Sequence, residues 1–516
     1  MLRLLMGKKI HVNQLGYRPG DPKKAVIPQG ETAFRVVRVS DGAGVYDGTA
    51  GGAVHDVASM DTVHVADFSS VTEKGEYVLC VAGEKSYPFV IDDNPCAGLR
   101  KALLDMFHYQ KCGVDLDCDL WSHPSCHDSP ATVYGTNEKK EVSGGWHDAG
   151  DYGRYVVPAA MAVADLLLAY ELSPVPDPEL LETVWFEVEW MLKMQDAKTG
   201  GVYHKVGCGQ FNALDEMPHD ERGELILSPV SPTATADFAA TMALASRFYP
   251  NAKDALLSAA KRAWDWCVAN PDTPNFKNPP DIRTGEYGDI NNKDERFWAA
   301  CELFAATGDE TYHDAIKSGE IHVGLGWADM GTYGLVAYLN HAGDKACASL
   351  TAMIKDKLLC ACDNVISQYQ NDPYGISLGT KYRWGSNLDV ANNAMTLLLG
   401  RRFADDGGKI YTEAALEHLH YLLGRNPLSQ SYVTGFGSAA PRHPHHRPSV
   451  AVGSAVPGMV VGGPNMNTPR DLTLHAHCEG LPPSRCYVDH SDSFASNEVA
   501  IYWNSTVYFV VAVLGL

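Results

Sequence analysis

The segment from Ser143 to Tyr155, SGGWHDAGDYGRY, contains the residue types best suited to acid–base chemistry. Two carboxylates, Asp148 and Asp151, lie three residues apart in a loop rich in glycine. The apolar run that follows has Pro158 near its front, which predicts a helix beginning directly after the loop. The partial positive charge at that helix end favours ionised carboxylates just ahead of it. Aspartate is also a common helix cap, but two acids beside a tryptophan, a histidine and several glycines indicate an active-site loop.

A second acidic segment, CYVDHSDSFASNEVAIYWNSTVYFV, lies close to the C-terminus. We expect Glu498 to open the last helix, with Asp489 and Asp492 ahead of it. A helix N-terminus lowers the pKa of a carboxyl group, whereas a general acid needs a raised pKa. Burial, or the negative charges of Asp148 and Asp151, would therefore have to raise the pKa of Glu498. The alternative is that Glu498 only complements the helix dipole.

Metal ligands lie beside the first acidic loop. Two cysteines and two histidines form a closed tetrahedral set for zinc, and they are Cys112, Cys126, His127 and His147. Their spacing is not that of a standard zinc finger, and Cys118 and His123 are rival ligands. One structural zinc ion at this place would hold the loop that carries Asp148 and Asp151.

The segment 435–449, GFGSAAPRHPHHRPS, alternates proline and histidine and includes Arg442 and Arg447. Such a loop offers imidazole and guanidinium donors to hydroxyl groups, although a histidine-rich tract can also bind a metal. Aromatic side chains also gather in or beside the loops. Single aromatics there usually anchor packing, but several around one cleft would suit the apolar faces of sugar rings. They are Trp146, Tyr203, Trp327, Tyr374, Tyr382, Trp384 and Trp503.

Two regions with different patterns must position these residues. Residues 8–92 contain short runs rich in Val, Tyr and Phe, separated by turn signals such as DGAG and EKG, which predict a small β-sandwich. Asp92-Asp93-Asn94-Pro95 ends this pattern, so we expect a first domain at 1–93 and a second at 94–516.

The second region is predicted to be helical throughout. No strands are expected between its helices, which would exclude a parallel sheet, and long loops at 200–232, 270–292, 371–387 and 425–496 are expected to carry function. The pattern favours a ring of helical hairpins, an α/α toroid. The predicted helices are 96–110, 154–172, 178–195, 233–249, 252–269, 293–306, 309–319, 328–341, 345–370, 388–403, 410–424 and 497–514.

The bulk composition limits the classes of function. A chain of 516 residues exceeds what one core usually supports. Its formal charge of −21 argues against nucleic acid or an anionic membrane as a partner. The N-terminal MLRLLMGKKIHVNQ has too short an apolar patch for a secretory signal. The 13 cysteines are odd in number and scattered, which suits a reducing compartment. We therefore expect a cytoplasmic protein, or a secreted one if a signal was removed.

The whole chain resembles glycoside hydrolase family 9, in the subgroup with an N-terminal immunoglobulin-like domain. Three dispersed motifs follow one another in the order found in that family. HVNQLGYRPGDPKKAVI resembles the start of that domain, and GGWHDAGDYGRYV resembles the loop with the catalytic base. SYVTGFGSAAPRHPHHRPS is similar to the His-x-Arg signature, here His445 and Arg447. YVDHSDSFASNEVAIYWNS is similar to the signature of the acid, and RWGSNLDVANNAM to a Trp-Gly-Ser-Asn segment. One departure is Ala439, where the family usually has a polar or basic residue.

The resemblance implies a β-sandwich followed by an (α/α)6 barrel. It further implies inverting hydrolysis of β-1,4-glucosidic bonds in cellulose, cellodextrins or mixed-linkage β-glucan. We expect the protein to be a monomer. Asp151 would be the base that activates water, Asp148 its partner and Glu498 the general acid. Relatives with this Cys-Cys-His-His set carry structural zinc, and many bind calcium, whose ligands we do not identify here. We expect substrate contacts from His204, Trp327, Trp384, His445, Arg447, Asp489 and Tyr502.

Three other functions remain open. An exo-β-glucosaminidase acting on chitosan oligomers could use the same scaffold, with acids that bind a 2-amino group. A polysaccharide lyase on an α/α toroid would need a tyrosine or histidine base and a cationic site, which the acidic loops argue against. A carbohydrate-binding protein without catalysis would have no reason to retain Asp148, Asp151 and Glu498.

Overall fold

A computed structural model describes residues 9–466 and 469–516 of the chain. It divides into two compact units. Unit 1 contains the chain up to Met106, Cys362–His445 and Gly453–Leu516, and unit 2 contains Phe107–Ala361 and His446–Val452. Asp148 and Asp151 therefore belong to unit 2, and Glu498 to unit 1. No helix among the described residues combines the length and apolar character needed to cross a membrane.

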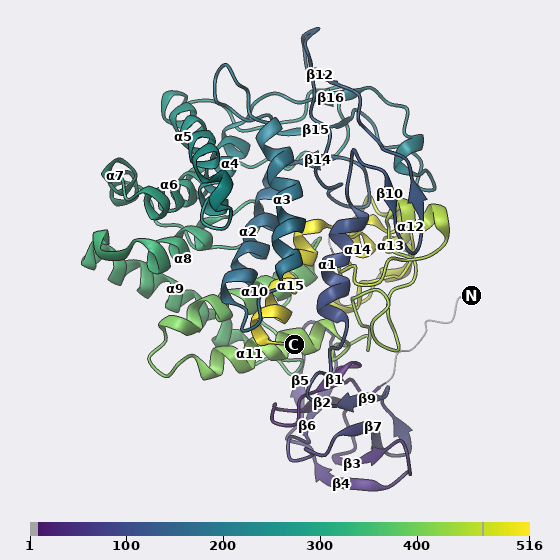
Figure 1. Cartoon of the computed structure of the whole chain (residues 1–516). Coiled ribbons are helices and arrows are strands. Elements are labelled where there is room, and N and C mark those ends of the chain that lie inside the picture. The colour runs from purple at the N-terminus through teal and green to yellow at the C-terminus, as the bar shows by residue number, and fades with distance from the viewer. Residues whose placement is uncertain (1–8, 467–468) are drawn as a thin grey trace. The chain divides into compact units, whose positions relative to one another are not determined.

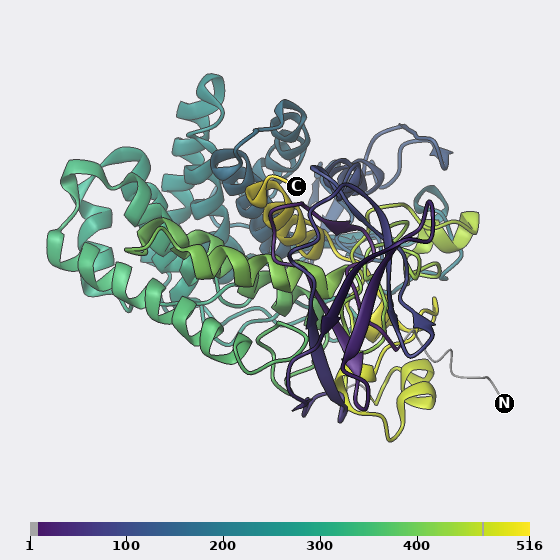
Figure 2. The same cartoon turned by 90° about the horizontal axis from the view of Figure 1, so that it is seen from below.

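The N-terminal part of unit 1 is a β-sandwich, as the sequence predicts (Figures 1 and 2). Within the described residues one sheet has the order β1-β9-β7-β3-β4, with β8 paired to β7, and the other has the order β2-β6-β5. Phe34 and Val36 of β3 are buried while their neighbours are more exposed, which is the period of two that a sheet with one covered face requires. The strands are β1 (Gly16–Tyr17), β2 (Lys24–Pro28), β3 (Ala33–Arg38), β4 (Gly44–Thr49), β5 (Val54–His55), β6 (Thr62–Asp67), β7 (Gly75–Val81), β8 (Glu84–Lys85) and β9 (Phe89–Ile91).

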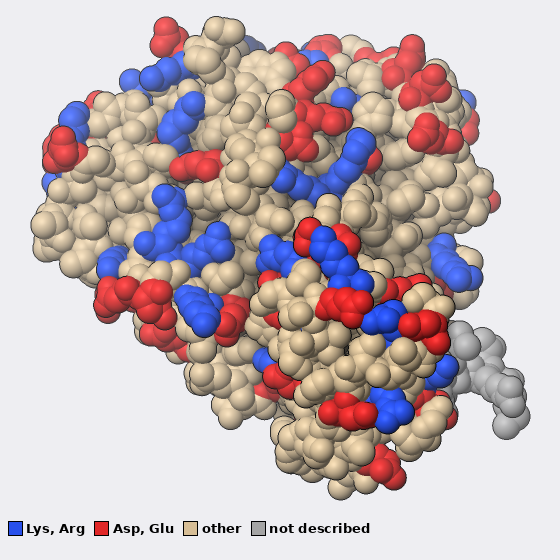
Figure 3. Space-filling view, turned by 60° about the horizontal axis from the view of Figure 1, so that its bottom comes forward, with Lys and Arg blue, Asp and Glu red and all other residues tan. Residues whose placement is uncertain are grey.

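Several charged side chains on the sandwich form ion pairs. Figure 3 shows Lys and Arg interspersed with Asp and Glu on this face. The ion pairs include Arg35–Asp47 at 2.5 Å and Arg38–Glu73 at 2.7 Å. Because these pairs are exposed, they contribute little to the free energy of folding.

The rest of unit 1 is helical and packs around α15 (Ile501–Leu514), whose side chains are all buried. Figure 1 shows it in yellow beside α10 and α11, which pack against it. The other helices of this unit are most of α1 (Leu99–Tyr109), the C-terminal part of α9 (Ala348–Tyr369), α10 (Ser386–Gly400), α11 (Lys409–Leu422), α13 (Leu472–Cys478) and α14 (Phe494–Asn497).

Buried polar contacts join the sandwich to the helical part of unit 1. Lys24 of β2 lies 3.3 Å from Glu417 of α11, and Glu417 also pairs with Arg425. Burial raises the pKa of Glu417, but Arg425 and Lys24 outweigh this effect, so that its pKa lies below the usual value. Asn13 Nδ2 meets His420 Nδ1 at 2.8 Å, and Gln14 Nε2 donates to the Ser429 carbonyl at 2.7 Å.

Unit 2 is built from helical hairpins. The inner helices α2, α4, α6 and α8 pack against one another in series, and α3, α5 and α7 each pack on one of them. Almost every residue of α2 and α4 is buried, as expected for helices with neighbours on all sides. The helices are α2 (Val156–Leu172), α3 (Pro178–Lys193), α4 (Pro232–Ala245), α5 (Lys253–Ala269), α6 (Lys293–Thr307), α7 (Glu310–Ser318), α8 (Gly331–His341), the N-terminal part of α9, and α12 (Arg447–Val452).

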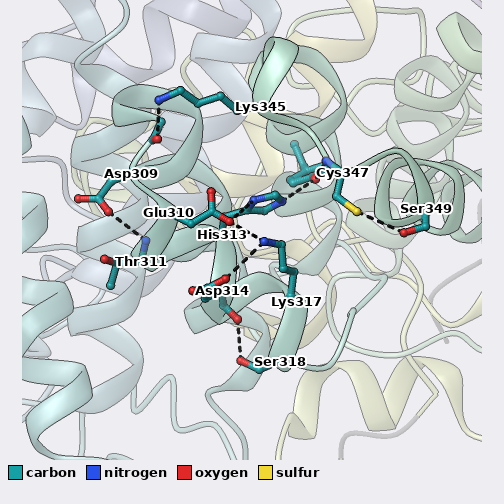
Figure 4. Close-up of polar contacts among 12 residues, drawn as sticks. Asp309, Glu310, Thr311, His313, Asp314, Lys317, Ser318, Lys345, Cys347 and Ser349 are labelled. Carbon is teal, nitrogen blue, oxygen red and sulfur yellow. Dashed lines mark hydrogen bonds and ion pairs between the residues drawn. The ribbon is translucent and has the colours of Figure 1, made fainter.

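Local contacts explain where these helices begin. The side chain of Asp177 accepts from Glu179 N, and Pro178 takes the first helical position of α3. Figure 4 shows the same device at α7, where the Asp309 side chain accepts from Thr311 N at 2.9 Å. Figure 4 also shows Lys345 donating to the Gly308 carbonyl at 2.6 Å, which links the end of α6 to the turn before α9.

One prediction about the fold is wrong. Strands do occur between the helices of unit 2, and β12 pairs with β16 in parallel. Most have only two or three residues, too few to show a hydrophobic period. They are β10 (Leu116–Asp117), β11 (Ser122–His123), β12 (Ala131–Val133), β13 (Lys139–Lys140), β14 (Arg154–Tyr155), β15 (Lys205–Cys208) and β16 (Leu225–Leu227).

Candidate active site

The loop with the two aspartates enters α2 without capping it. The N-cap of α2 is Tyr155, which has no side-chain cap hydrogen bond, so neither aspartate serves as the cap. Both side chains are nonetheless withdrawn from solvent, with 1% of Asp148 and 8% of Asp151 exposed. The tight path depends on Gly145, because its φ of +78° is left-handed and a Cβ there would lie 2.6 Å from the Trp190 ring. These observations rule out the alternative that the two aspartates serve only as helix caps.

Each aspartate accepts a hydrogen bond from a different tyrosine. Tyr287 donates to Asp148 Oδ2 at 2.5 Å, and Tyr155 donates to Asp151 Oδ2 at 3.3 Å. Gly153 N also donates to Asp151 Oδ2, at 3.1 Å. The two tyrosine rings meet edge to face with centroids 4.9 Å apart. Tyr287 has a φ of +46°, a strained value for a bulky residue of the kind found at functional sites.

The two aspartates differ in their surroundings. Burial raises the pKa of Asp148 well above its usual value; Tyr287 lowers it, and the charge of Asp151 raises it further. Asp148 Oδ1 is buried without a hydrogen-bond partner among the described residues. A pair of carboxyl groups in unequal environments is the arrangement from which acid–base catalysts obtain separate roles.

Lys205 of β15 completes this group. Its Nζ lies 5.4 Å from the centroid of the Tyr155 ring and 3.3 Å from Thr284 Oγ1. Burial lowers the pKa of Lys205 to about 8, although the charge of Asp151 opposes the effect. Burial and the charges of Asp151 and Asp148 raise the pKa of Tyr155 well above its usual value. The hydroxyl of Tyr155 therefore stays protonated and remains a donor to Asp151.

The predicted zinc ligands come together in unit 2. One ligand atom from each of Cys112, Cys126, His127 and His147 lies within 4.8 Å of all the others. The Cys112 and Cys126 sulfurs are 3.9 Å apart, and Cys126 Sγ is 3.9 Å from His147 Nε2. Two sulfurs and two imidazoles at this spacing fit a tetrahedral zinc ion. The rival ligands Cys118 and His123 do not belong to this group.

The neighbours of Cys126 favour its ionised thiolate form, which is the form that binds a metal. The hydrogen bond from Cys112, followed by those from His127 and His147, lowers the pKa of the Cys126 thiol. His127 Nε2 lies 2.9 Å from Glu221 Oε2, which is the outer carboxylate contact that commonly orients a metal-binding histidine. His147 precedes Asp148 directly, so the cluster and the first aspartate share one backbone segment.

Three predicted substrate contacts, Trp327, His204 and Arg447, lie in unit 2. Trp327 is half-buried and meets the Tyr287 ring at 5.2 Å, beside the aspartate pair. His204 is fully buried, with its nitrogens bonded to Ser231 Oγ and the Glu286 carbonyl at 2.9 Å each. We therefore withdraw it as a sugar ligand, because it has no exposed surface.

Arg447 supports the loop with its guanidinium, and its contact with substrate stays a prediction. It is 5% exposed, and its Nη1 and Nη2 donate to the carbonyls of Gly150 and Asn212 at 2.8 and 3.1 Å. The ring of Phe211 lies 5.5 Å from the guanidinium carbon. Phe211 is 51% exposed and had no motif to mark it in the sequence.

Glu498 lies in unit 1 and does not open the last helix. The helix α15 begins at Ile501, and Glu498 is in extended chain after α14, in a parallel bridge with His445. Gly462 N donates to the Glu498 carbonyl at 3.0 Å, so its backbone is held while its side chain is half-buried. The prediction that Glu498 opens the last helix is therefore wrong, since α15 starts three residues later.

The loops beside Glu498 position it. Asp489 accepts from Arg442 N at 2.8 Å, His443 N at 2.9 Å and Asn497 Nδ2 at 3.1 Å. These contacts make Asp489 an anchor for the histidine-rich loop, rather than a side chain with both oxygens available to a sugar. His445 Nδ1 donates to the Ser491 carbonyl at 2.6 Å, which orients its ring.

Aromatic residues also lie near Glu498. Trp384 is 49% exposed and packs on Phe494 with ring centroids 5.3 Å apart, and the His445 ring lies 6.2 Å from Phe494. This places the predicted contacts Trp384 and His445 in one aromatic group. Tyr502 is 6% exposed, in the first turn of α15, and presents little surface to a ligand.

A group of buried carboxylates in unit 2 escaped the sequence analysis. Asp237 of α4 and Glu295 of α6 are both fully buried, and neither oxygen of Asp237 has a partner among the described residues. Burial, together with neighbouring acids that include Asp289 and Asp294, raises the pKa of Asp237 and Glu295 well above their usual values. Neither carboxylate oxygen of Glu295 has a hydrogen-bond partner among the described residues either. Such a set is stable only with bound protons or a cation.

Known proteins share both the motifs and the fold. The model of the cellulase N-terminal Ig-like domain matches residues 6–86, and the model of glycosyl hydrolase family 9 matches residues 97–511. The cellodextrinase of Butyrivibrio fibrisolvens is 35% identical, over 98% of this chain and 99% of its own length.

Solved structures give the same result. A single mutant of a thermostable endoglucanase from Alicyclobacillus acidocaldarius superposes with a TM-score of 0.91 at 39% identity, covering 98% of this chain and 99% of that one. A zinc-binding triple mutant of the GH family 9 endoglucanase J30 has a TM-score of 0.89 at 31% identity, covering 97% and 99%. With its catalytic motifs, its N-terminal sandwich and these likenesses over nearly its full length, the chain belongs to glycosyl hydrolase family 9.

Proposed function

We propose that this protein hydrolyses β-1,4-glucosidic bonds in cellulose, cellodextrins or mixed-linkage β-glucan with inversion at the anomeric carbon. The observation that carries the proposal is the buried pair Asp148 and Asp151, each fixed by its own tyrosine on a glycine-rich loop. The likeness to a cellodextrinase and to endoglucanases supports glucan as the substrate class.

Each carboxyl group has a defined task in this reaction. Asp151 takes a proton from water as the water attacks the anomeric carbon, and Asp148 holds that water. Because Gly153 and Tyr155 both donate to Asp151 Oδ2, we assign the proton to Oδ1. Glu498 gives its proton to the departing glycosidic oxygen. An inverting enzyme holds its acid and base about 6.5–9.5 Å apart to leave room for the water.

Metal ions would serve the scaffold of this enzyme. Cys112, Cys126, His127 and His147 would hold one structural zinc, which ties the chain before Asp148 to the segment that follows α1. The likeness to a zinc-binding family member supports this choice of metal. Calcium prefers oxygen ligands, and the buried carboxylates around Asp237 offer them. We propose these carboxylates as the calcium ligands.

One experiment tests substrate, cleavage position and stereochemistry together. The enzyme is mixed with cellotetraose, and the anomeric protons are followed by NMR during the first minutes. We expect α-anomers first and mutarotation later, because water attacks directly. Cellobiose as the main product would indicate internal or processive cleavage, and glucose with cellotriose would indicate exo action. β-Anomers formed first would refute inversion, and cleavage of chitosan oligomers alone would support the glucosaminidase instead.

A further inference from the structure

Gln110, the residue directly after α1, holds the backbone of the aspartate loop. Gln110 is 1% exposed. Its Nε2 donates to the carbonyls of His147 at 3.0 Å and Ala149 at 2.9 Å, the residues on either side of Asp148. Its own carbonyl accepts from His147 N at 2.7 Å. Both amide protons of Gln110 are therefore spent on the backbone that flanks the first aspartate.

His446 fixes the orientation of that amide. Because Gln110 Nε2 faces two carbonyls, its Oε1 must be the atom that meets His446 Nε2 at 2.9 Å. His446 Nε2 therefore carries a proton and donates it, and His446 Nδ1 accepts from Ser449 Oγ at 2.8 Å. His446 is 1% exposed, so this chain of hydrogen bonds is shielded from water.

The next residue extends the same support to the other end of the loop. Arg447 N and Nη1 both donate to the Gly150 carbonyl, at 3.1 and 2.8 Å. The carbonyls of residues 147, 149 and 150 are thus all held by Gln110 and Arg447. These three carbonyls belong to the backbone on either side of Asp148 and directly before Asp151. This backbone sets the directions of both carboxylate side chains.

We infer that Gln110 and His446 are positioning residues for the hydrolytic reaction. They hold the backbone on both sides of Asp148, so that Asp148 and Asp151 present their carboxylates to the attacking water in one direction. This inference rests on the proposed function, since it assumes that the two aspartates act on water. It also explains why the histidine-rich loop has a buried histidine beside the signature pair His445 and Arg447.

The test compares variants that remove the donors with variants that keep them. Gln110→Met keeps the length of the side chain and loses both amide protons, and His446→Phe keeps a ring and loses its N–H. His446→Gln restores a donor near the position of Nε2. The matched control is Gln195→Met, because buried Gln195 also donates from Nε2 to two carbonyls, of Gly200 and Ala259, at 2.9 and 3.0 Å.

The readout is kcat and KM per folded chain, on cellotetraose and on a dinitrophenyl cellobioside. A shift of about 1 Å in a reacting group can cost on the order of 10²-fold, so we expect kcat to fall roughly 10–100-fold in Gln110→Met and His446→Phe. KM should stay within about threefold, and the loss should be equal on both substrates, because the attack by water is common to them. His446→Gln should recover most of kcat, and Gln195→Met should lower the melting temperature and leave kcat unchanged.

The outcomes separate this inference from the proposed function. If kcat stays within about threefold of wild type in Gln110→Met and His446→Phe, or falls equally in Gln195→Met, the positioning role is refuted. If Gln110→Met does not fold, the comparison of His446→Phe with His446→Gln decides. The proposed function fails separately if the wild-type enzyme releases no α-anomers, or if Asp151→Asn retains activity within about tenfold of wild type.

Discussion

Replacement of Tyr287 by phenylalanine removes the hydroxyl that donates to Asp148 Oδ2 over 2.5 Å. Asp148 is buried, and its Oδ1 has no partner among the described residues, so this hydrogen bond favours the ionised form against the effect of burial. Its loss raises the pKa of Asp148. A hydrogen bond to a charged group contributes about 1.5–3 kcal/mol, and about 1.4 kcal/mol corresponds to one pH unit, so the change should amount to roughly 1–2 pH units.

This change should appear in the acid limb of the pH profile. If Asp148 must be ionised to hold the water, activity is lost as the pH falls through its pKa. The acid limb of kcat/KM on cellotetraose should therefore move to higher pH in Tyr287→Phe by about 1–2 pH units, and the alkaline limb should stay in place. The measurement is kcat/KM at half-unit steps between about pH 4 and 9.

A matched control distinguishes this effect from general damage. Tyr134 also donates to a carboxylate, Asp281 at 2.8 Å, outside the aspartate loop. Tyr134→Phe should leave both limbs unchanged. If Tyr287→Phe lowers kcat at every pH without moving the acid limb, Asp148 is not the group whose ionisation limits the reaction, and the reasoning is refuted.

Three further changes test the acid and the two metal sites. Glu498→Gln should be severe on cellotetraose and milder on a dinitrophenyl cellobioside, whose leaving group needs little protonation; equal losses would mean that Glu498 only shapes the site. Elemental analysis should find about one zinc per chain, and Cys126→Ser should lose it together with melting temperature, whereas metal-free protein of unchanged stability would show ordinary buried thiols. Addition of calcium after chelation should raise the melting temperature, since an ion at about 100 times its Kd contributes about 2.7 kcal/mol. Asp237→Asn should weaken that response, and an equal response would place calcium elsewhere.

The sequence predicts the long elements well because their signals are local. Asp177 and Pro178 mark the start of α3 by a cap and a fixed φ, and the observed helix begins at Pro178. The loop with Asp148 and Asp151 and the proposed zinc ligands also stand out by residue type and by their grouping along the chain. The same local logic fails at Glu498, where the segment NEVAIYW has the apolar pattern of a helix start. There the bridge to His445 keeps the chain extended, and such a long-range contact leaves no local trace.

The supporting residues were missed for a related reason. Tyr287 lies 139 residues from Asp148, and His446 lies 336 residues from Gln110. Tyr287 has no motif around it, and His446 lies inside the histidine-rich signature without being one of its marked residues, so only folding reveals their partners. His204 shows the opposite error, because a polar residue was assigned to the substrate although its ring is buried and bonded within the protein. Burial, which decides between these roles, is set by tertiary packing.

The N-terminal domain cannot be exchanged without regard to its buried polar contacts. These are the contacts of Lys24, Asn13 and Gln14 with α11 and with the chain that follows it. Lys24 is a countercharge for the buried Glu417, and Gln14 occupies backbone groups near Ser429. Excision of the sandwich would leave these groups facing water or one another, in the same unit that carries Glu498. A grafted domain, an inserted linker or a replacement binding module would therefore have to preserve the polar contacts of this buried surface. The sandwich and the helical part of unit 1 therefore have to be engineered together.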